Sequence, residues 1–480
     1  MANDSMLKFV DREQSYPDKR TADERADDFR EIAQRYAVEP AEEQAGRCSQ
    51  CGVPYCSVHC PLHNHIPDWL RLTAEGRLRE AYELSNATST MPEICGRICP
   101  QDRLCEGNCV IEFTGHGAVT IGSVEKFITD TAWENGWVEP LVPGKSRGQS
   151  VGVIGAGPAG LTAAEYLRGH GYDVHVYDRY DRAGGLLTYG IPGFKLEKPI
   201  VMRRVERLKA AGIVFHEGFA VGEDASLDEL RQRHDAVLIA TGVYKARAMD
   251  LPGGGSNGVV AALDFLVASN RKGFGDAVPA FDDGSLNAEG KDVVVIGGGD
   301  TAMDCVRTAI RQGAKSVKCL YRRDRANMPG SQREVANAEE EGVEFVWLSG
   351  PQSFDGGDVV SSVKVRKMRL GAPDASGRRA PEPDPAGDYS VDADLVIKAL
   401  GFDAEDLPSL FATPELGVSR WGTVLVDGKT LMTSLDGVFA AGDIVRGASL
   451  VVWAIRDGRD VAATMHKWLK TKAANAKVAA

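Results

Sequence analysis

Ten cysteines occur in this 480-residue chain, and eight of them lie between residues 48 and 109. A chain of this length can bury a hydrophobic core without disulfide staples. So many thiols in so short a segment indicate a metal or cluster site, and this part of the chain must fold around it. The eight form two runs: Cys48, Cys51, Cys56 and Cys60, followed by Pro61, and then Cys95, Cys99, Cys105 and Cys109, with Pro100 directly after Cys99.

The spacing of these cysteines favours two 4Fe-4S clusters over the two alternatives. The Cys-Pro steps and the gaps of two to four residues resemble bacterial ferredoxin runs, in which four thiolates hold each cluster. Structural zinc usually takes two Cys-x2-Cys pairs, and only one such pair occurs here. Disulfides would require an oxidising compartment, but residues 1–14 (MANDSMLKFVDREQ) lack the apolar core of a signal peptide, so we expect a cytoplasmic protein.

Charge and hydrophobicity argue against nucleic-acid binding and against a membrane-spanning segment. The formal net charge is −12, which argues against nucleic acid as a ligand. No stretch approaches 18 consecutive apolar residues, so we expect no membrane-spanning segment.

A strand, a glycine-rich turn and a helix follow one another twice in the chain. Strands are predicted at 151–154 and 174–177, and again at 293–296 and 317–321. The separation of about 140 residues indicates two Rossmann-like α/β domains. A mostly helical segment precedes them, with an amphipathic helix predicted near residues 29–36. The polar, proline- and glycine-rich residues 371–390 predict an exposed hairpin loop without chemistry.

The first glycine turn has the fingerprint of a dinucleotide site. Gly155 permits the tight turn, Gly157 lets the backbone approach a pyrophosphate, and Gly160 lets the helix pack on the strand. Asp178 ends the second strand, where a carboxylate accepts hydrogen bonds from ribose hydroxyls. Strand, helix and terminal acid together argue against a glycine-rich turn that binds nothing.

The second turn predicts a different nucleotide. It reads Gly297-Gly298-Gly299-Asp300-Thr301-Ala302, with alanine in place of the third glycine. Its second strand ends in Arg322 and Arg323 instead of an acid, and guanidinium groups there suit a 2′-phosphate. This site therefore predicts NADPH, and the first site FAD or NAD. A solvated basic surface patch is the alternative explanation of the arginines.

These modules together form an electron path. A nicotinamide delivers two electrons as hydride, an iron–sulfur cluster accepts one at a time, and a flavin can do both. The first site is therefore assigned to FAD. Hydride transfer needs stacked rings and exclusion of water, so we expect no catalytic acid–base residue.

Five segments of the chain resemble one known protein family. They are residues 47–69, 95–109, 184–195, 297–304 and 438–443, and they resemble the small (beta) subunit of bacterial NADPH-dependent glutamate synthase. The same module is similar to the N-terminal part of dihydropyrimidine dehydrogenase. The resemblance covers nearly the whole chain.

The resemblance implies an arrangement of domains in which the NADPH domain interrupts the FAD domain. It predicts a helical iron–sulfur domain over 1–145, an FAD-binding domain over 146–255 and 411–480, and an NADPH-binding domain over 256–410. It also implies that Gly185, Thr241, Gly242 and Asp443 contact the flavin.

The family further implies how the cysteines are shared. Cys48, Cys51, Cys56 and Cys109 would hold one cluster, and Cys60, Cys99 and Cys105 the other. The eighth ligand would be Glu125, at the position where dihydropyrimidine dehydrogenase has a glutamine. Cys95 is the rival, because thiolate is the commoner ligand. Cys305 and Cys319 are expected to be small core residues.

The resemblance also implies a partner. Making glutamate from glutamine and 2-oxoglutarate requires a glutaminase and an FMN site, and this chain has no room for either, so a large subunit should carry them. The main alternative is a related NADPH:acceptor subunit serving pyrimidine reduction or a ferredoxin. A thioredoxin-reductase-like enzyme would need a Cys-x-x-Cys near the flavin, which residues 150–480 lack. A zinc scaffold is the non-enzymatic alternative.

Overall fold

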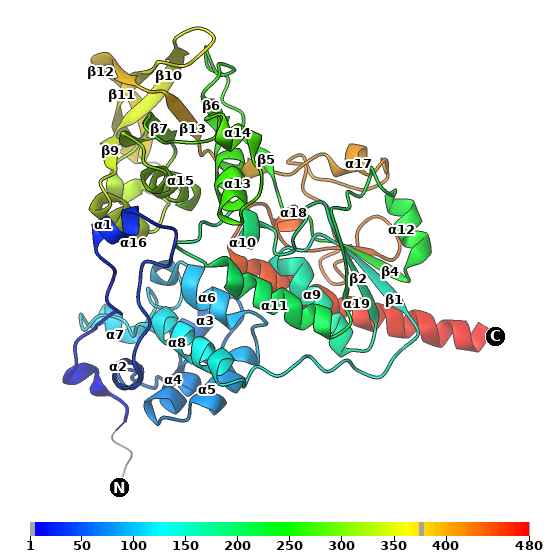
Figure 1. Ribbon diagram of the computed structural model, residues 1–480. Coiled ribbons are helices and arrows are strands. Elements are labelled where there is room, and N and C mark those ends of the chain that lie inside the picture. Colours follow the sequence, from blue (N-terminus) through cyan, green and yellow to red (C-terminus); the bar gives the residue numbers. More distant parts are fainter. Residues whose placement is uncertain (1–4, 374–378, 480) are drawn as a thin grey trace.

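The structure, a computed structural model, describes residues 5–373 and 379–479 (Figure 1). Short helices make up the N-terminal part, and the two glycine turns lie in two separate parallel sheets. The four predicted strands are confirmed as β1 (Ser150–Ile154), β2 (Asp173–Asp178), β7 (Asp292–Ile296) and β8 (Ser316–Tyr321). The predicted fold class is therefore confirmed.

The N-terminal helices pack around their own core, in which the largest fully buried side chain is Trp69. The predicted amphipathic helix at 29–36 is wrong, because residues 27–37 are not helical. Phe29 instead packs near Phe194 of the next domain, with 6.3 Å between the ring centroids. The helices are α1 (Ala22–Ala26), α2 (Val38–Ala45), α3 (Tyr55–Val58), α4 (Ile66–Ala74), α5 (Leu78–Asn86), α6 (Pro92–Ile98), α7 (Val110–Phe113) and α8 (Ile121–Glu134).

The first parallel sheet has the strand order β15-β4-β1-β2-β3. Its edge strand comes from the C-terminal part of the chain, some 200 residues after its neighbour β4. The remaining bounds are β3 (Val214–Glu217), β4 (Ala236–Ile239) and β15 (Val438–Ala440), with helices α9 (Pro158–Gly169), α10 (Leu186–Tyr189), α11 (Lys198–Ala210), α12 (Leu227–Arg233), α17 (Leu407–Leu410), α18 (Asp443–Arg446) and α19 (Val451–Ala479).

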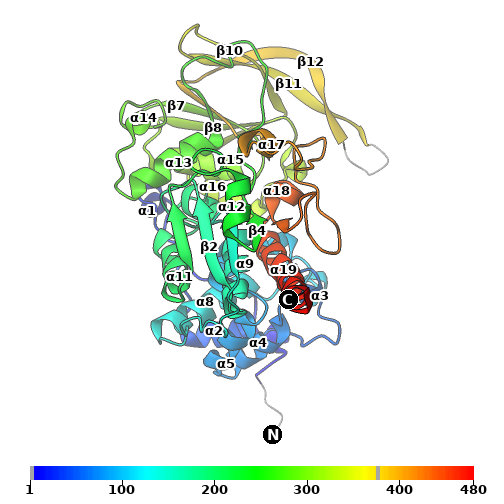
Figure 2. The same ribbon diagram turned by 90° about the vertical axis from the view of Figure 1, so that its right-hand side faces the viewer.

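The second parallel sheet has the order β6-β13-β7-β8-β9 and lies between β4 and β15 in the sequence. The three-stranded antiparallel sheet β10-β11-β12 lies beside it, at the top of the molecule in Figure 2. The bounds are β6 (Val259–Ala261), β9 (Glu344–Trp347), β10 (Ser349–Asp355), β11 (Ser362–Pro373), β12 (Arg379–Asp392) and β13 (Leu395–Lys398), with helices α13 (Ala262–Gly273), α14 (Pro279–Asp282), α15 (Asp300–Arg311) and α16 (Gln332–Glu340); β5 (Lys245–Ala246) and β14 (Phe402–Asp403) pair separately.

The segment 371–390, predicted as a hairpin loop, is largely strand. β11 and β12 pair along most of their length, for example Val363 with Val391. Residues 374–378 of the predicted loop lie outside the described residues, as do residues 1–4 of the N-terminal segment. Among the described helices, none combines the length and the apolar character needed to cross a membrane.

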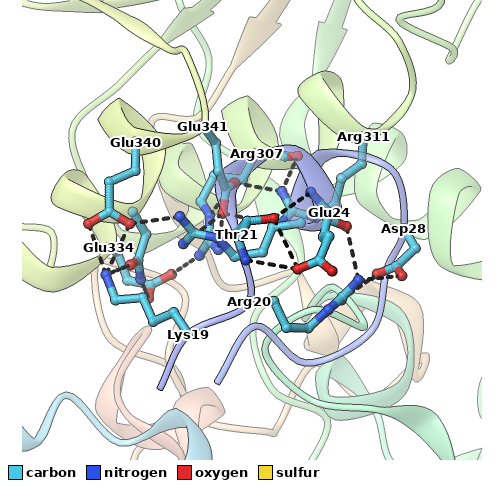
Figure 3. Close-up of polar contacts among 12 residues, drawn as sticks. Lys19, Arg20, Thr21, Glu24, Asp28, Arg307, Arg311, Glu334, Glu340 and Glu341 are labelled. Atoms are coloured by element: carbon cyan, nitrogen blue, oxygen red, sulfur yellow. Dashed lines mark hydrogen bonds and ion pairs between the residues drawn. The ribbon is translucent and has the colours of Figure 1, made fainter. Parts of the chain in front are cut away.

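An N-terminal arm, residues 19–28, lies against α15 and α16 of the second sheet's domain (Figure 3). Lys19 and Arg25 both pair with Glu340, at 2.9 and 2.7 Å. Beneath them, Arg307 and Arg311 pair with the buried Glu341 at 2.8 and 2.6 Å. Each buried charge thus has an opposite partner, as burial requires.

Candidate functional site: two nucleotide cavities and two cysteine groups

A cavity of about 190 Å³ lies where the first glycine turn meets the end of β4 and the start of α18. Gly155, Gly157, Asp178, Thr241, Gly242 and Asp443 line it. They come from segments that are far apart in the sequence and that the parallel sheet brings to one edge, where ligands of open α/β sheets bind.

The three glycines of the first turn meet different surroundings. A Cβ on Gly155 would lie 2.4 Å from the Ala240 carbonyl oxygen, and one on Gly160 would lie 1.9 Å from that of Gly155. These two positions therefore have no room for a side chain. A Cβ on Gly157 would meet no protein atom within 4 Å, so only an occupant of the cavity would contact it.

The polar groups of this cavity fit a dinucleotide. The Thr241 Oγ1 is buried without a hydrogen-bond partner among the described residues, and it belongs to the lining. Asp178 accepts the Ala156 backbone N–H at 2.6 Å, which holds the turn against the end of β2, and burial raises its pKa. Burial also raises the pKa of Asp443, which accepts a hydrogen bond from Ser449 at 2.6 Å.

Gly185 does not line the cavity but supports it. It has a φ of +56°, which favours glycine, and a Cβ there would lie 2.9 Å from the Gly157 Cα. Sequence motifs did not predict Tyr244, which also lines the cavity. The Arg179 guanidinium carbon lies 4.7 Å from the centroid of its ring.

A larger cavity, of about 1050 Å³, lies at the second glycine turn. Gly297, Gly299, Thr301, Arg322 and Arg323 line it. Gly299 is open to the cavity in the same way as Gly157, because a Cβ there would meet nothing within 4 Å. Asp300 lies outside the lining and pairs with Arg103 at 2.8 Å.

The antiparallel sheet β10-β11-β12 forms a further wall of this cavity, which the sequence did not predict. Its contribution includes Arg366, Met368 and Pro383, the last of these from the segment predicted to have no chemistry. These contacts depend on how a hairpin folds back over the parallel sheet, and no local sequence signal reports that.

Arg322 and Arg323 are available to a ligand. Among the described residues, neither guanidinium has an ion-pair or hydrogen-bond partner, and the Arg323 Nε is buried. Their neighbour Arg325 differs, because Glu339 holds it at 2.6 Å. Two unpaired cations at the end of β8 are what a 2′-phosphate requires.

We predict that replacing both Arg322 and Arg323 by alanine raises the KM for NADPH and leaves that for NADH nearly unchanged. Loss of two charge-assisted contacts costs roughly 2–4 kcal/mol, or about 30-fold or more in KM. Arg325→Ala is the matched control. Equal weakening with both nucleotides would show that these arginines do not read the 2′-phosphate.

The cysteines form two adjoining groups, and Cys105 of the second is near enough to Cys56 of the first to interact with it electrostatically. Cys48, Cys51, Cys56 and Cys109 interact electrostatically with one another, and burial with these neighbours raises the pKa of Cys48 to about 11 and of Cys56 to about 12. Cys109 comes directly before α7, so the first group joins the start of the cysteine segment to its end.

The second group encloses a small cavity. Cys60, Cys95, Cys99, Cys105 and Glu125 all line it, so both rival ligands are present. The neighbouring Cys95 and burial hold the pKa of Cys99 well above its usual range, and burial raises that of Glu125 to about 8. Within the described part of the chain, no hydrogen bond affects the pKa of the Glu125 carboxylate, and the only charge that raises it is that of Glu93.

This donor set fits iron–sulfur clusters. A buried thiol stays protonated unless a cation replaces its proton, and a metal ion does so. Within residues 5–373 and 379–479, no three His, Cys, Asp or Glu side chains converge as the ligands of a single ion do. The thiolates of a four-iron cluster bind different iron atoms and surround a volume instead. Cys305 and Cys319 are fully buried core residues, as predicted.

Comparison with known families agrees with this geometry. Residues 149–458 match the family described as pyridine nucleotide-disulphide oxidoreductase, and residues 25–137 match dihydropyrimidine dehydrogenase domain II, 4Fe-4S cluster. A solved structure, Mycobacterium tuberculosis FprA in complex with NADPH, has the same fold with a TM-score of 0.57 at 21% identity, covering 69% of this chain and 86% of that one. Fold and site thus define an oxidoreductase of the pyridine nucleotide class with an N-terminal iron–sulfur domain.

Curated relatives narrow the class. The chain is 67% identical to the glutamate synthase (NADPH) small chain of Azospirillum brasilense over 98% of both chains, and 46% identical to that of Escherichia coli K12 over 97% and 99%. A putative oxidoreductase of Escherichia coli K12 is 44% identical over 95% of this chain and 70% of its own length. The chain belongs to the family of glutamate synthase (NADPH) small chains.

Proposed function

We propose that this chain is the electron-input subunit of an NADPH-dependent glutamate synthase. It oxidises NADPH at the second glycine turn, binds FAD at the first, and passes electrons through its iron–sulfur domain to a large subunit. That subunit would carry the glutaminase and FMN sites and make glutamate from glutamine and 2-oxoglutarate. The observation that carries the proposal is the 67% identity over nearly the full length of a chain with that name.

In the proposed function, each nucleotide site has its own set of binding residues. FAD, when bound, converts a hydride into single electrons. The Gly155–Gly160 turn presents backbone N–H groups to its pyrophosphate, and Thr241 supplies an unpaired hydroxyl. Arg322 and Arg323 select the 2′-phosphate of NADPH. No side chain needs to move a proton during hydride transfer, and this is consistent with cavities lined mainly by glycine and apolar residues.

The proposal includes the domain boundaries 1–145, 146–255 with 411–480, and 256–410. The membership of β15 in the first sheet supports a chain that leaves the FAD domain and returns to it. β6 and β13, which lie near the start and the end of residues 256–410, pair in the second sheet. This pairing supports an inserted domain that spans the sequence from one strand to the other.

Two 4Fe-4S clusters are part of the proposal. Cys48, Cys51, Cys56 and Cys109 would hold the first. Cys60, Cys99 and Cys105 would hold the second, with Glu125 as the eighth ligand. Cys95 lines the same cavity and is the alternative ligand.

We predict about eight iron atoms and eight acid-labile sulfides per assembled chain, the content of two four-iron clusters. Iron and sulfide analysis of the native complex measures this directly. Stoichiometric zinc without sulfide would contradict the proposed electron path. About four iron atoms per chain would show that the chain holds one four-iron cluster and not two.

A related NADPH:acceptor subunit is the second candidate, because the 44% identical relative carries the name putative oxidoreductase. Purification of the native complex and identification of the bound chain separates the two candidates. A bound chain with glutaminase activity supports the first, and any other oxidoreductase supports the second.

A further inference from the structure

The segment from Cys99 to Glu106 contacts the second nucleotide domain through three charged residues, Asp102, Arg103 and Glu106. Arg103 bonds Asp300 at 2.8 Å and the Pro329 carbonyl oxygen at 2.6 Å. Asp102 accepts a hydrogen bond from Ser331 at 3.2 Å. The other contact joins Glu106 to Arg333 at 2.5 Å. A segment that brings two candidate cluster ligands into place is thus tied to the second glycine turn.

Asp300 is the first residue of α15, the helix that begins at this turn. Its two carboxylate oxygens are both bonded: one accepts the Ser331 backbone N–H at 3.0 Å, and the other accepts from Arg103. A carboxylate normally stabilises a helix N-terminus, but it also cancels the positive end that favours a bound phosphate. Arg103 supplies the compensating charge.

The loop at residues 329–331 covers the glycine turn. The Gly330 N–H donates to the Gly298 carbonyl at 2.9 Å, and Pro329 lines the nucleotide cavity. Because Arg103 holds the Pro329 carbonyl and the Asp300 carboxylate together, one side chain positions both the loop and the charge at this edge of the cavity.

We propose that Arg103, a residue of the iron–sulfur domain, is a positioning residue of the NADPH site. It neutralises Asp300 and anchors the 329–331 loop, so that the dinucleotide phosphates meet an electropositive helix end. The inference rests on the proposed function, since it requires NADPH at the second turn. Through Arg103, the affinity for the nucleotide depends on the docking of the iron–sulfur domain. By thermodynamic linkage, a bound nucleotide also stabilises that docking.

The test measures NADP⁺ dissociation constants by calorimetry on the full chain with its flavin and clusters. Arg103→Ala should raise the constant about five- to tenfold, since an unpaired carboxylate then lies near the phosphates. The increase should shrink at high ionic strength. With NADPH and a dye acceptor, KM should rise by the same factor while kcat stays unchanged.

Lys19→Ala is the matched control. Lys19 also joins the N-terminal region to the second nucleotide domain through an ion pair, with both side chains 43% exposed, against 41% and 38% for Arg103 and Asp300. Its partner Glu340 lies at the end of α16 and not at the glycine turn, so Lys19→Ala should leave the dissociation constant unchanged.

Two further variants separate charge from folding. Arg103→Gln keeps a donor for the Pro329 carbonyl and removes only the charge, so it should weaken binding nearly as much as alanine. Asp300→Asn in the Arg103→Ala background should restore affinity, because no carboxylate is left to compensate.

Two results have different meanings. A wild-type chain that does not bind NADP⁺ at all overturns the proposed function. The inference alone is overturned if the wild-type chain binds NADP⁺ and both Arg103→Gln and Arg103→Ala bind it equally tightly. The Lys19→Ala control should then show the same dissociation constant.

Discussion

A Gly157→Val chain is expected to fold normally and to contain almost no flavin. A Cβ at this position meets no protein atom within 4 Å, and the backbone has φ −77° and ψ −177°, which any residue adopts. The variant should therefore lose only about 1 kcal/mol of stability, the cost of valine at a helix N-cap. Its methyl groups would occupy the space of the pyrophosphate, so flavin content should fall below about a tenth of the wild-type value.

Gly169→Val is the control for this variant. It lies at the other end of the same helix, α9, is exposed, and likewise meets no atom within 4 Å. Its flavin content should equal that of the wild type. Flavin-to-protein absorbance ratios report both variants, and full flavin content in Gly157→Val would require the FAD site to lie elsewhere.

Cys99→Ala is expected to abolish NADPH-driven glutamate synthesis by the complex while sparing dye reduction. Cys99 lines the cavity of the second cysteine group and lies outside both nucleotide cavities. Loss of a cluster ligand interrupts the path to the partner, so synthesis should fall to about 1% or less, whereas dye reduction by the flavin should stay within about twofold.

Cys305→Ala controls for the loss of a buried cysteine, because Cys305 belongs to the core of the second nucleotide domain. It should retain both activities. If Cys99→Ala kept its iron content and its glutamate synthesis, Cys99 would not be a ligand and the second cluster would need another set of residues.

The parts of the fold that could be predicted are those with strong local signals. The strands before each glycine turn combine apolar residues with a turn that requires glycine. Gly155 has a φ of +106°, and a Cβ there would lie 2.4 Å from the Ala240 carbonyl oxygen. Cys305 and Cys319 could also be placed in the core, since an isolated cysteine behaves as a small apolar residue.

The parts that could not be predicted depend on contacts between distant segments. The periodicity at 29–36 indicated a helix, but Phe29 packs near Phe194 of the next domain, whereas Tyr36 packs into the N-terminal core from a chain that is not helical. Glu31 pairs with Arg97 at 2.6 Å. Tertiary contacts outweigh helix propensity there. The cavity wall formed by β10-β11-β12 depends on a hairpin that folds back over the second parallel sheet. The Arg103–Asp300 pair forms only when the N-terminal domain and the second nucleotide domain come together.

The most direct test of the proposed electron path is the glutamate formed from NADPH, glutamine and 2-oxoglutarate by the purified chain, alone and with its large subunit. The chain alone should oxidise NADPH with an artificial acceptor and form no glutamate, because the glutaminase and FMN sites of the proposal lie on the large subunit. Adding the large subunit should start glutamate formation. Glutamate made by the chain alone, or none made by the assembled pair, would contradict the assignment of this chain as the electron-input subunit.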